Sequence, residues 1–261
     1  MKMITPLKFA LAAALAALSC NTSFAAVLAS DNAADSAYAD GWQNGDNGGT
    51  GFGVWVFGGN TISGTTAKIA SSTLNGPGSI DVSGSSFQLL DSGNYVDVFR
   101  FLTGGDLTVG QTFSLDMKVN FRGGFKGITV RGADDSTSLF KFETGNPGTG
   151  DDYIVYDATT GNGSIGNSYS NNTVFNIALT QTTVGGGSWA INRTGGITSL
   201  SSGTYTGAVS SIQLFSAFSS STGTPEQTIF YNNFAVVPEP ATIGMLLGGA
   251  GLLAFVRRRR S

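Results

Sequence analysis

The sequence contains no histidine at any of its 261 positions. This absence excludes a Ser-His-Asp triad and a Cys-His pair, because both use an imidazole as the general base. It also excludes the usual zinc and iron sites, which depend on imidazole and thiolate ligands. The chemistry that remains uses carboxylates, either as a pair that acts on a glycosidic bond or as oxygen ligands for calcium.

Cysteine is nearly absent as well, and the only one, Cys20, lies in a leader-like segment at the N-terminus. In this segment two lysines precede an apolar run over residues 9–18, and small residues follow it, which is the pattern of a secretory signal peptide. We predict that residues 1–25 are removed by signal peptidase, with the cut between Ala25 and Ala26. The exported part then has no disulfide, and its stability must come from a hydrophobic core of ordinary size.

Positive charge is scarce in the central part of the chain, which we expect to form one domain over residues 26–235. Between residue 25 and the C-terminal 26 residues there are 8 basic and 16 acidic residues, a net charge of −8. An acidic surface is a poor match for a phosphate backbone, so nucleic acid is not expected as a partner. The Gly-x-Gly strings, such as residues 49–53, lie in polar loop-like sequence and do not indicate a nucleotide site.

Helical periodicity is absent before the C-terminal segment, whereas strand periodicity is frequent. Residues 113–121 alternate five apolar with four polar positions, as expected of a strand with one solvated face. The same alternation recurs over residues 128–130, 140–142, 175–179, 189–191 and 212–214, and residues 96–102 are apolar on both sides, which favours a central strand. Glycine- and asparagine-rich turns separate these runs. The predicted fold class is therefore all-β, an antiparallel β-sandwich or jelly roll.

The last 26 residues, 236–261, have a different composition. Val237-Pro238-Glu239-Pro240 precedes an apolar run of 16 residues, 241–256, and the four arginines Arg257, Arg258, Arg259 and Arg260 follow it. As a helix the run reaches about 24 Å, slightly less than a hydrocarbon core of about 30 Å. We predict a single transmembrane helix. The arginines should stay in the cytoplasm as a stop-transfer signal, which places the preceding domain outside the cytoplasmic membrane.

This C-terminal segment resembles the PEP-CTERM sorting signal of Gram-negative bacteria in its motif, its glycine-interrupted apolar helix and its arginine cluster. The resemblance implies recognition by exosortase, removal of the tail, and delivery to the cell surface or the extracellular polysaccharide matrix. The alternative is a permanent C-terminal anchor that no enzyme cuts.

A second resemblance covers most of the exported part loosely. A β-sandwich module found in other PEP-CTERM proteins is similar to the chain over residues 30–33, 40–42, 45–55, 99–102, 107–113 and 231–234. The resemblance implies a fold that can be compared with concanavalin A-like proteins, and it carries no activity.

Four aspartates, Asp31, Asp35, Asp40 and Asp46, lie close together at the start of the exported part. Calcium takes six to eight oxygen ligands, and a loop of this composition could provide several. The alternative is that these side chains form turns by bonding to their own backbone. No cofactor is expected otherwise, so they are the candidates for a metal.

Tryptophans and acidic doublets are the remaining candidates for chemistry. Trp55 lies among apolar residues and is expected in the core, whereas Trp42 lies in polar sequence and is the candidate for stacking on a sugar ring. The doublets Asp134-Asp135 and Asp151-Asp152 are expected in turns. Two acids from different strands, with Glu143 or Asp116 as a partner, could still form a carboxylate pair.

These patterns favour a non-catalytic protein of the cell surface or extracellular matrix that associates with polysaccharide. The rival hypothesis is a secreted carbohydrate-active hydrolase or lyase that uses a carboxylate pair. A spacer without any ligand is the third hypothesis.

Overall fold

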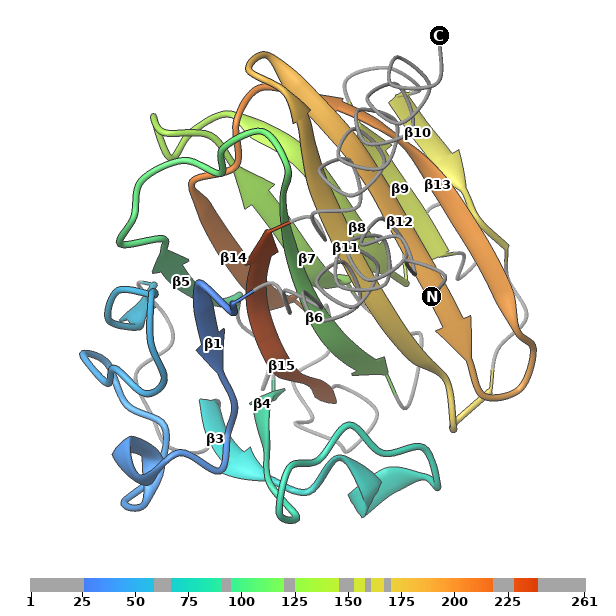
Figure 1. Cartoon of the computed structure of the whole chain (residues 1–261). Helices are drawn as coiled ribbons and strands as arrows, with labels where there is room; N and C mark the ends of the chain where they lie inside the picture. Colours follow the sequence, from blue (N-terminus) through green and yellow to red (C-terminus); the bar gives the residue numbers. More distant parts are fainter. Residues whose placement is uncertain are drawn as a thin grey trace, which may run out of the picture. The chain divides into compact units, whose positions relative to one another are not determined.

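The computed structural model of the chain describes residues 26–58, 67–90, 95–119, 125–145, 153–157, 161–166, 170–217 and 228–238. Two antiparallel β-sheets pack face to face over these residues (Figure 1), which confirms the predicted all-β sandwich. The helices within the described ranges are two short 3₁₀ turns, η1 (Ser36–Tyr38) and η2 (Ser72–Asn75). None of the described helices has the length and apolarity needed to cross a membrane. The predicted signal peptide and transmembrane helix lie outside the described residues.

One sheet has eight strands in the described part of the chain. Its order is β13 (Ser199–Thr206), β12 (Gly186–Thr194), β11 (Val174–Thr183), β6 (Gln111–Val119), β15 (Thr228–Pro238), β4 (Ser86–Leu90) and β3 (Ala67–Ala70), and β1 (Ala29–Asp31) pairs with β15. The apolar residues of β6 alternate inward as its sequence predicts, and Phe113, Leu115 and Met117 are buried.

The second sheet has seven strands over the same described ranges. Its order is β10 (Gly161–Ser164), β9 (Tyr153–Asp157), β8 (Ser138–Thr144), β7 (Phe125–Arg131), β14 (Ser211–Ala217), β5 (Val96–Phe101) and β2 (Val56–Phe57). The strand predicted over residues 96–102 is present as β5, an interior strand that lies second from the edge of the sheet, between β14 and the two-residue strand β2. The outer face of β5 is also partly apolar, because Phe99 points to that face and lies under the guanidinium of Arg131.

The strand β15 has different neighbours along its length. It pairs with β6 on one side almost throughout, whereas on the other side β4 pairs with residues 228–231 and β1 pairs with residues 234–236. A bulge between Asn232 and Ala235 marks the change. The buried carboxamide of Asn232 accepts from the backbone N–H of Ala33 and donates to the carbonyls of Ile80 and Ser85. One side chain thus satisfies the backbone groups of three segments that meet there.

The loop around η2 is held by a buried cation. The ammonium of Lys118 donates hydrogen bonds to the carbonyl oxygens of Ser72, Gly76 and Gly78. An ammonium has three donors and no acceptor, so this geometry uses all of them.

Candidate functional site

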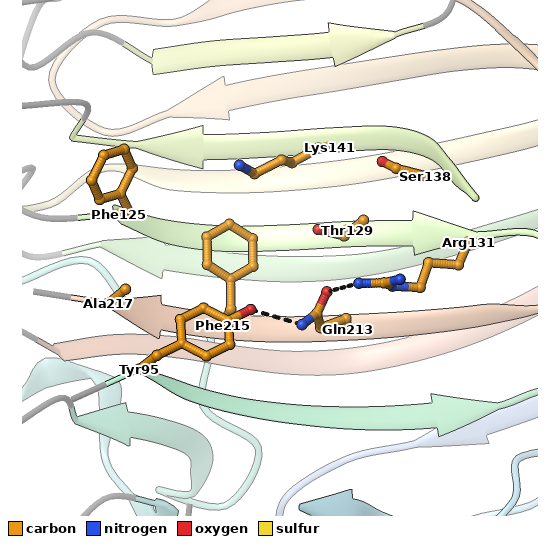
Figure 2. Close-up of a pocket in the computed structure, with 9 residues that line it drawn as sticks. All are labelled: Tyr95, Phe125, Thr129, Arg131, Ser138, Lys141, Gln213, Phe215 and Ala217. Atoms are coloured by element: carbon orange, nitrogen blue, oxygen red, sulfur yellow. Dashed lines mark hydrogen bonds between the residues drawn. The ribbon is translucent and has the colours of Figure 1, made fainter. Parts of the chain in front are cut away.

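The outer face of the seven-stranded sheet carries an open groove of about 400 Å³ over β5, β14, β7 and β8 (Figure 2). Its volume lies within the range of small-ligand sites, about 300–1,000 Å³. The lining residues are Tyr95, Phe125, Thr129, Arg131, Ser138, Lys141, Gln213, Phe215 and Ala217.

The strand register explains why these side chains meet. Gln213 lies opposite Thr129, and Thr129 lies opposite Lys141 on the next strand, so one row crosses β14, β7 and β8. The sequence neighbours of these residues point the other way: Ile128, next to Thr129, and Leu214, next to Gln213, face inward and are fully buried. Because side chains alternate between the two faces of a strand, one set of residues forms the core and the other set forms the floor of the groove.

A chain of hydrogen bonds crosses one half of the groove. The guanidinium of Arg131 donates to Oε1 of Gln213 at 2.5 Å, and Nε2 of Gln213 donates to Tyr95 Oη at 2.7 Å and to Asp97 Oδ2 at 2.8 Å. A guanidinium only donates, so Arg131 fixes which way the amide of Gln213 points. In this orientation Tyr95 Oη accepts a hydrogen bond from Gln213, so the Tyr95 hydroxyl can still donate its own proton to a ligand.

Burial controls the protonation of this half of the groove. It raises the pKa of Tyr95 to about 12, and the nearby charge of Asp97 acts in the same direction. The pKa of Asp97 is also raised, because burial disfavours its charged form. The Tyr95 hydroxyl therefore keeps its proton at any physiological pH.

The other half of the groove is organised around Lys141. Its ammonium lies 2.5 Å from a carboxylate oxygen of Glu143 and 4.8 Å from the ring centre of Tyr156, whose hydroxyl donates to Glu143. The side chain of Lys141 is 32% exposed, whereas Glu143 is buried. Lys141 thus presents positive charge at the rim while its counter-ion lies beneath it.

The groove also collects positive charge in an acidic domain. Among the seven described cations of the domain, four are buried: Arg100, Lys118, Lys126 and Arg193. Lys68, Arg131 and Lys141 are the three that are half-exposed, and two of these line the groove. The Nε atom of Arg131 is buried and has no hydrogen-bond partner within the described residues.

The acids on this face are not arranged as a hydrolytic pair. Asp97 lies opposite Phe215, Phe215 lies opposite Gly127, and Gly127 lies opposite Glu143. Three strand spacings place the Cα atoms of the two acids about 14 Å apart. Glycosidases need carboxylates roughly 5–10 Å apart, and the ring of Phe215 lies between these two.

A second polar cluster, which we call the Arg100 centre (Asp31, Tyr38, Trp55 and Arg100), is buried near the N-terminus of the domain. The five N–H donors of Arg100 reach Asp31, the Tyr38 hydroxyl, the Asn47 side chain and the carbonyls of Gly48 and Gly53. The guanidinium also lies over the rings of Phe52 and Trp55, at 5.0 and 4.7 Å.

Three of the four metal candidates, Asp31, Asp35 and Asp46, use their carboxylates in separate structural contacts. Asp31 pairs with Arg100. Asp35 caps η1 by accepting from the backbone N–H of Ala37, and Asp46 accepts from that of Gln43. The backbone carbonyl of Asp40 accepts from the same glutamine. No group of three or more acidic, histidine or cysteine side chains converges in the described ranges, and calcium binding by these four residues stays a prediction.

Trp42 does not provide a stacking surface, and that prediction is corrected. Its side chain is 2% exposed and packs edge-on against Trp55 and Phe57, with centroid distances of 5.0 and 5.4 Å. Phe87, which is distant in sequence, covers it from a third direction at 4.9 Å. Trp55 is fully buried, so its predicted place in the core is confirmed.

The acidic doublets and Asp116 have local partners. Asp134 accepts from the hydroxyl and the backbone N–H of Thr137 and from the same groups of Ser136, and these bonds lower its pKa below the usual range, as expected of a turn-forming aspartate. Asp135 accepts from Ser211, and Asp116 accepts from the amides of Asn176 and Asn233. The doublet Asp151-Asp152 lies outside the described residues.

The terminal motifs are described only at their inner ends. Val237 and Pro238 are the last residues of β15, and Ala26 is exposed at the start of the described chain. Outside the described ranges lie Ala25, Glu239, Pro240 and the four arginines Arg257, Arg258, Arg259 and Arg260.

Sequence reasoning missed the groove itself. The available signal was that Gln213 lies between Ile212 and Leu214 in β14, and that Arg131 ends β7 directly after Val130, at positions where a strand buried on both faces would carry valine or isoleucine. A polar residue at such a position suggests a lined depression on the outer face, but the sequence does not show which strands are neighbours.

Residues 236–260 match the family described as the PEP-CTERM protein-sorting motif. The motif implies an exported protein that exosortase processes from a membrane-anchored precursor for delivery to the cell surface. No curated protein matches the chain in sequence.

Similar solved structures are β-sandwich proteins. The alginate lyase vAL-1 from Chlorella virus is 11% identical, with a TM-score of 0.36 over 66% of this chain and 89% of the lyase. The globular domain of T. cruzi calreticulin is 7% identical, with a TM-score of 0.45 over 78% of this chain and 95% of that domain. The ligand binding domain of botulinum neurotoxin serotype D, in complex with N-acetylneuraminic acid, is 14% identical, with a TM-score of 0.38 over 81% and 51%. Likeness of this degree says nothing about the ligand or reaction of this chain.

Proposed function

We propose that the domain is a non-catalytic surface or matrix protein that holds a chain of extracellular polysaccharide in the groove of its seven-stranded sheet. Export and sorting through the C-terminal motif bring it to the place where such polymers lie. The observation that carries the proposal is the composition of the groove, in which the rings of Tyr95, Phe125 and Phe215 lie toward one end and polar side chains such as Arg131 and Gln213 lie toward the other (Figure 2).

Sugar rings present an apolar C–H face and a periphery of hydroxyl groups, and this groove has partners for both. Tyr95 is 43% exposed and stacks on the buried Phe215 at 6.5 Å, so its ring offers a supported apolar surface. The guanidinium of Arg131, the ammonium of Lys141 and the hydroxyl of Tyr95 supply the donors of the groove, whereas both N–H groups of Gln213 are already bonded to Tyr95 and Asp97. Hydrogen bonds from charged donors contribute about 1.5–3 kcal/mol each, enough for a weak site that repeated contacts along a polymer strengthen.

The charge distribution favours an acidic polysaccharide. Two of the three half-exposed cations described in the domain line the groove, while the domain as a whole is acidic. A carboxylate-bearing sugar would be attracted to Arg131 and Lys141 and repelled by the acidic remainder of the domain. This charge pattern favours the groove over other surfaces, and acidic sugars over neutral ones.

Binding should be measured on an array that contains neutral and uronic-acid polysaccharides. We expect the uronic-acid polymers to bind, and Arg131→Ala and Lys141→Ala each to weaken binding roughly 10- to 100-fold, the equivalent of one charged hydrogen bond. Lys68→Ala is the matched control, since Lys68 is half-exposed on the other sheet. An array without any bound glycan would favour a spacer, and unchanged binding in the Arg131→Ala/Lys141→Ala double variant would place the site elsewhere.

The rival function, a hydrolase or lyase, is tested on the same polymers. The spacing of Asp97 and Glu143 argues against a carboxylate pair. We expect the chain length of a bound polysaccharide to stay constant during long incubation, measured by size-exclusion chromatography. Shortened chains that disappear with the Lys141→Ala variant would establish the rival.

Sorting is tested separately from binding. Replacement of Pro238-Glu239-Pro240 by three alanines should leave uncut precursor in the membrane fraction, as detected by immunoblot. Unchanged release of this variant would contradict processing through the motif, whatever the groove binds.

A further inference from the structure

The sorting motif joins the folded sheet without a spacer. The motif covers residues 236–260, and β15 extends to Pro238, so Val236, Val237 and Pro238 belong to both. Each of the three has a partner on β6: Val236 lies opposite Phe113, Val237 opposite Thr112, and Pro238 opposite Gln111. The first residues of the motif are therefore part of the eight-stranded sheet.

The strand β1 closes the other side of β15 as far as Val236, the first residue of the motif, whereas Val237 and Pro238 pair with β6. Ala29 lies opposite Val236, and the backbone N–H of Leu28 donates to the Val236 carbonyl at 2.8 Å. The pairs between β4 and β15 end at Tyr231, so β1 takes over the flank before the motif begins. Leu28 stands two residues after Ala26, the predicted first residue after signal-peptide cleavage. The predicted signal-peptidase cut and the start of the sorting motif therefore adjoin one pair of strands, β1 and β15.

A strand held on both sides is a poor substrate for an enzyme that acts on the backbone. Such enzymes bind extended chain through its N–H and C=O groups, and in a closed sheet these groups are already used. Val236 is also buried, so its side chain cannot enter an enzyme's subsite while it remains in place.

We propose that the end of β15 must separate from β6 and β1 before exosortase can take the motif, so that closure of β1 on β15 slows processing. The proposal depends on the sorting motif and is independent of the groove and its ligand. Local opening at the end of a strand is the type of motion that such access requires.

A disulfide between β6 and β15 tests the proposal directly. Thr112 and Val237 lie opposite each other, and opposed residues in antiparallel strands have Cα atoms about 4.5–5.5 Å apart, within the range that a disulfide spans. Thr112→Cys with Val237→Cys introduces the only thiols in the exported domain, because Cys20 leaves with the predicted leader. Ala178→Cys with Ala190→Cys, an opposed pair on β11 and β12, is the matched control.

Tail removal from the full-length precursor should be followed by pulse-chase in an exosortase-containing host. We expect the oxidised Thr112/Val237 variant to be processed at least tenfold more slowly than the control, and the rate to recover when a reductant opens the disulfide. Recovery separates the effect of the disulfide from that of the Val237 substitution. Processing of the disulfide-bonded form at the control rate would overturn the proposal, because exosortase would then take the motif while the end of β15 is still held against β6.

A linker insertion provides the opposite test and does not depend on disulfide formation. Six residues of Gly-Ser repeat between Val236 and Val237 should free the motif and accelerate processing several-fold. The same linker after Val184, which is 87% exposed in the turn between β11 and β12, is the control. Equal or slower processing with the first insertion would show that separation from the sheet does not limit access.

Discussion

The Arg100 centre and the groove use the same types of residue in opposite ways. Each combines an arginine, an aspartate, a tyrosine and several aromatic rings. In the Arg100 centre the five guanidinium donors all have protein partners and the cluster is buried. In the groove the guanidinium of Arg131 donates to the carbonyl of Asp135 and to Gln213, its buried Nε has no partner within the described chain, and Tyr95 and Lys141 reach the surface. Complete burial with every guanidinium donor bonded indicates a structural role, whereas the exposed parts of Tyr95 and Lys141 leave polar atoms for a ligand.

The largest expected effect comes from Arg100→Ala. This change leaves Asp31 as a buried unpaired charge, which should lower the free energy of unfolding by about 3–5 kcal/mol. In a domain of about 210 residues that corresponds to a melting temperature roughly 6–20 °C lower. Arg131→Ala should cost at most about 1 kcal/mol, because its partners lie at an open groove. Equal losses in urea unfolding would remove the distinction between the two clusters.

Trp42 should behave as part of the buried region. Trp42→Ala removes a ring packed against three others and should lower the free energy of unfolding by about 3–5 kcal/mol. Glycan binding by the fraction that remains folded should be unchanged. Loss of binding with unaltered thermal stability would instead restore Trp42 as a ligand-stacking residue.

The same change, tyrosine to phenylalanine, can be made in the Arg100 centre and in the groove, and its effects on stability and binding should differ between the two. The hydroxyl of Tyr38 donates to Asp31 at 2.6 Å and accepts from Trp55 Nε1 at 3.0 Å, so Tyr38→Phe leaves buried groups without partners. We expect a loss of about 1–3 kcal/mol. Tyr95→Phe should change stability by less than about 0.5 kcal/mol and weaken glycan binding instead, measured by thermal denaturation and the array. The reverse order of the two stability changes would contradict this assignment.

The smallest expected effect is that of a chelator. The N-terminal aspartates cap a turn, pair with Arg100 or bond to a nearby backbone, so EDTA should not change the melting temperature of the purified domain. A decrease that added calcium reverses would show that these acids also hold a cation.

The strands could be predicted from the sequence, and the groove could not. Alternation within residues 113–121 or 212–214 reports which side of a strand is apolar, and this local property also placed Trp55 in the core. The groove depends on β5, β14, β7 and β8 being neighbours, and β14 pairs with strands about 85 and 115 residues before it. No local pattern contains that order. Trp42 was misassigned for the same reason, because Phe87 covers it from 45 residues away.

The contact between Lys118 and the loop at η2 has a consequence for folding outside the cell. Many exported proteins close such loops covalently, and they then need an oxidising environment and an enzyme to form the bond. Here one ammonium reaches three carbonyl oxygens of the loop, and the closure forms as soon as the strand that carries it is in place. The loop therefore stays closed in reducing and anaerobic surroundings alike, without help from any thiol oxidase.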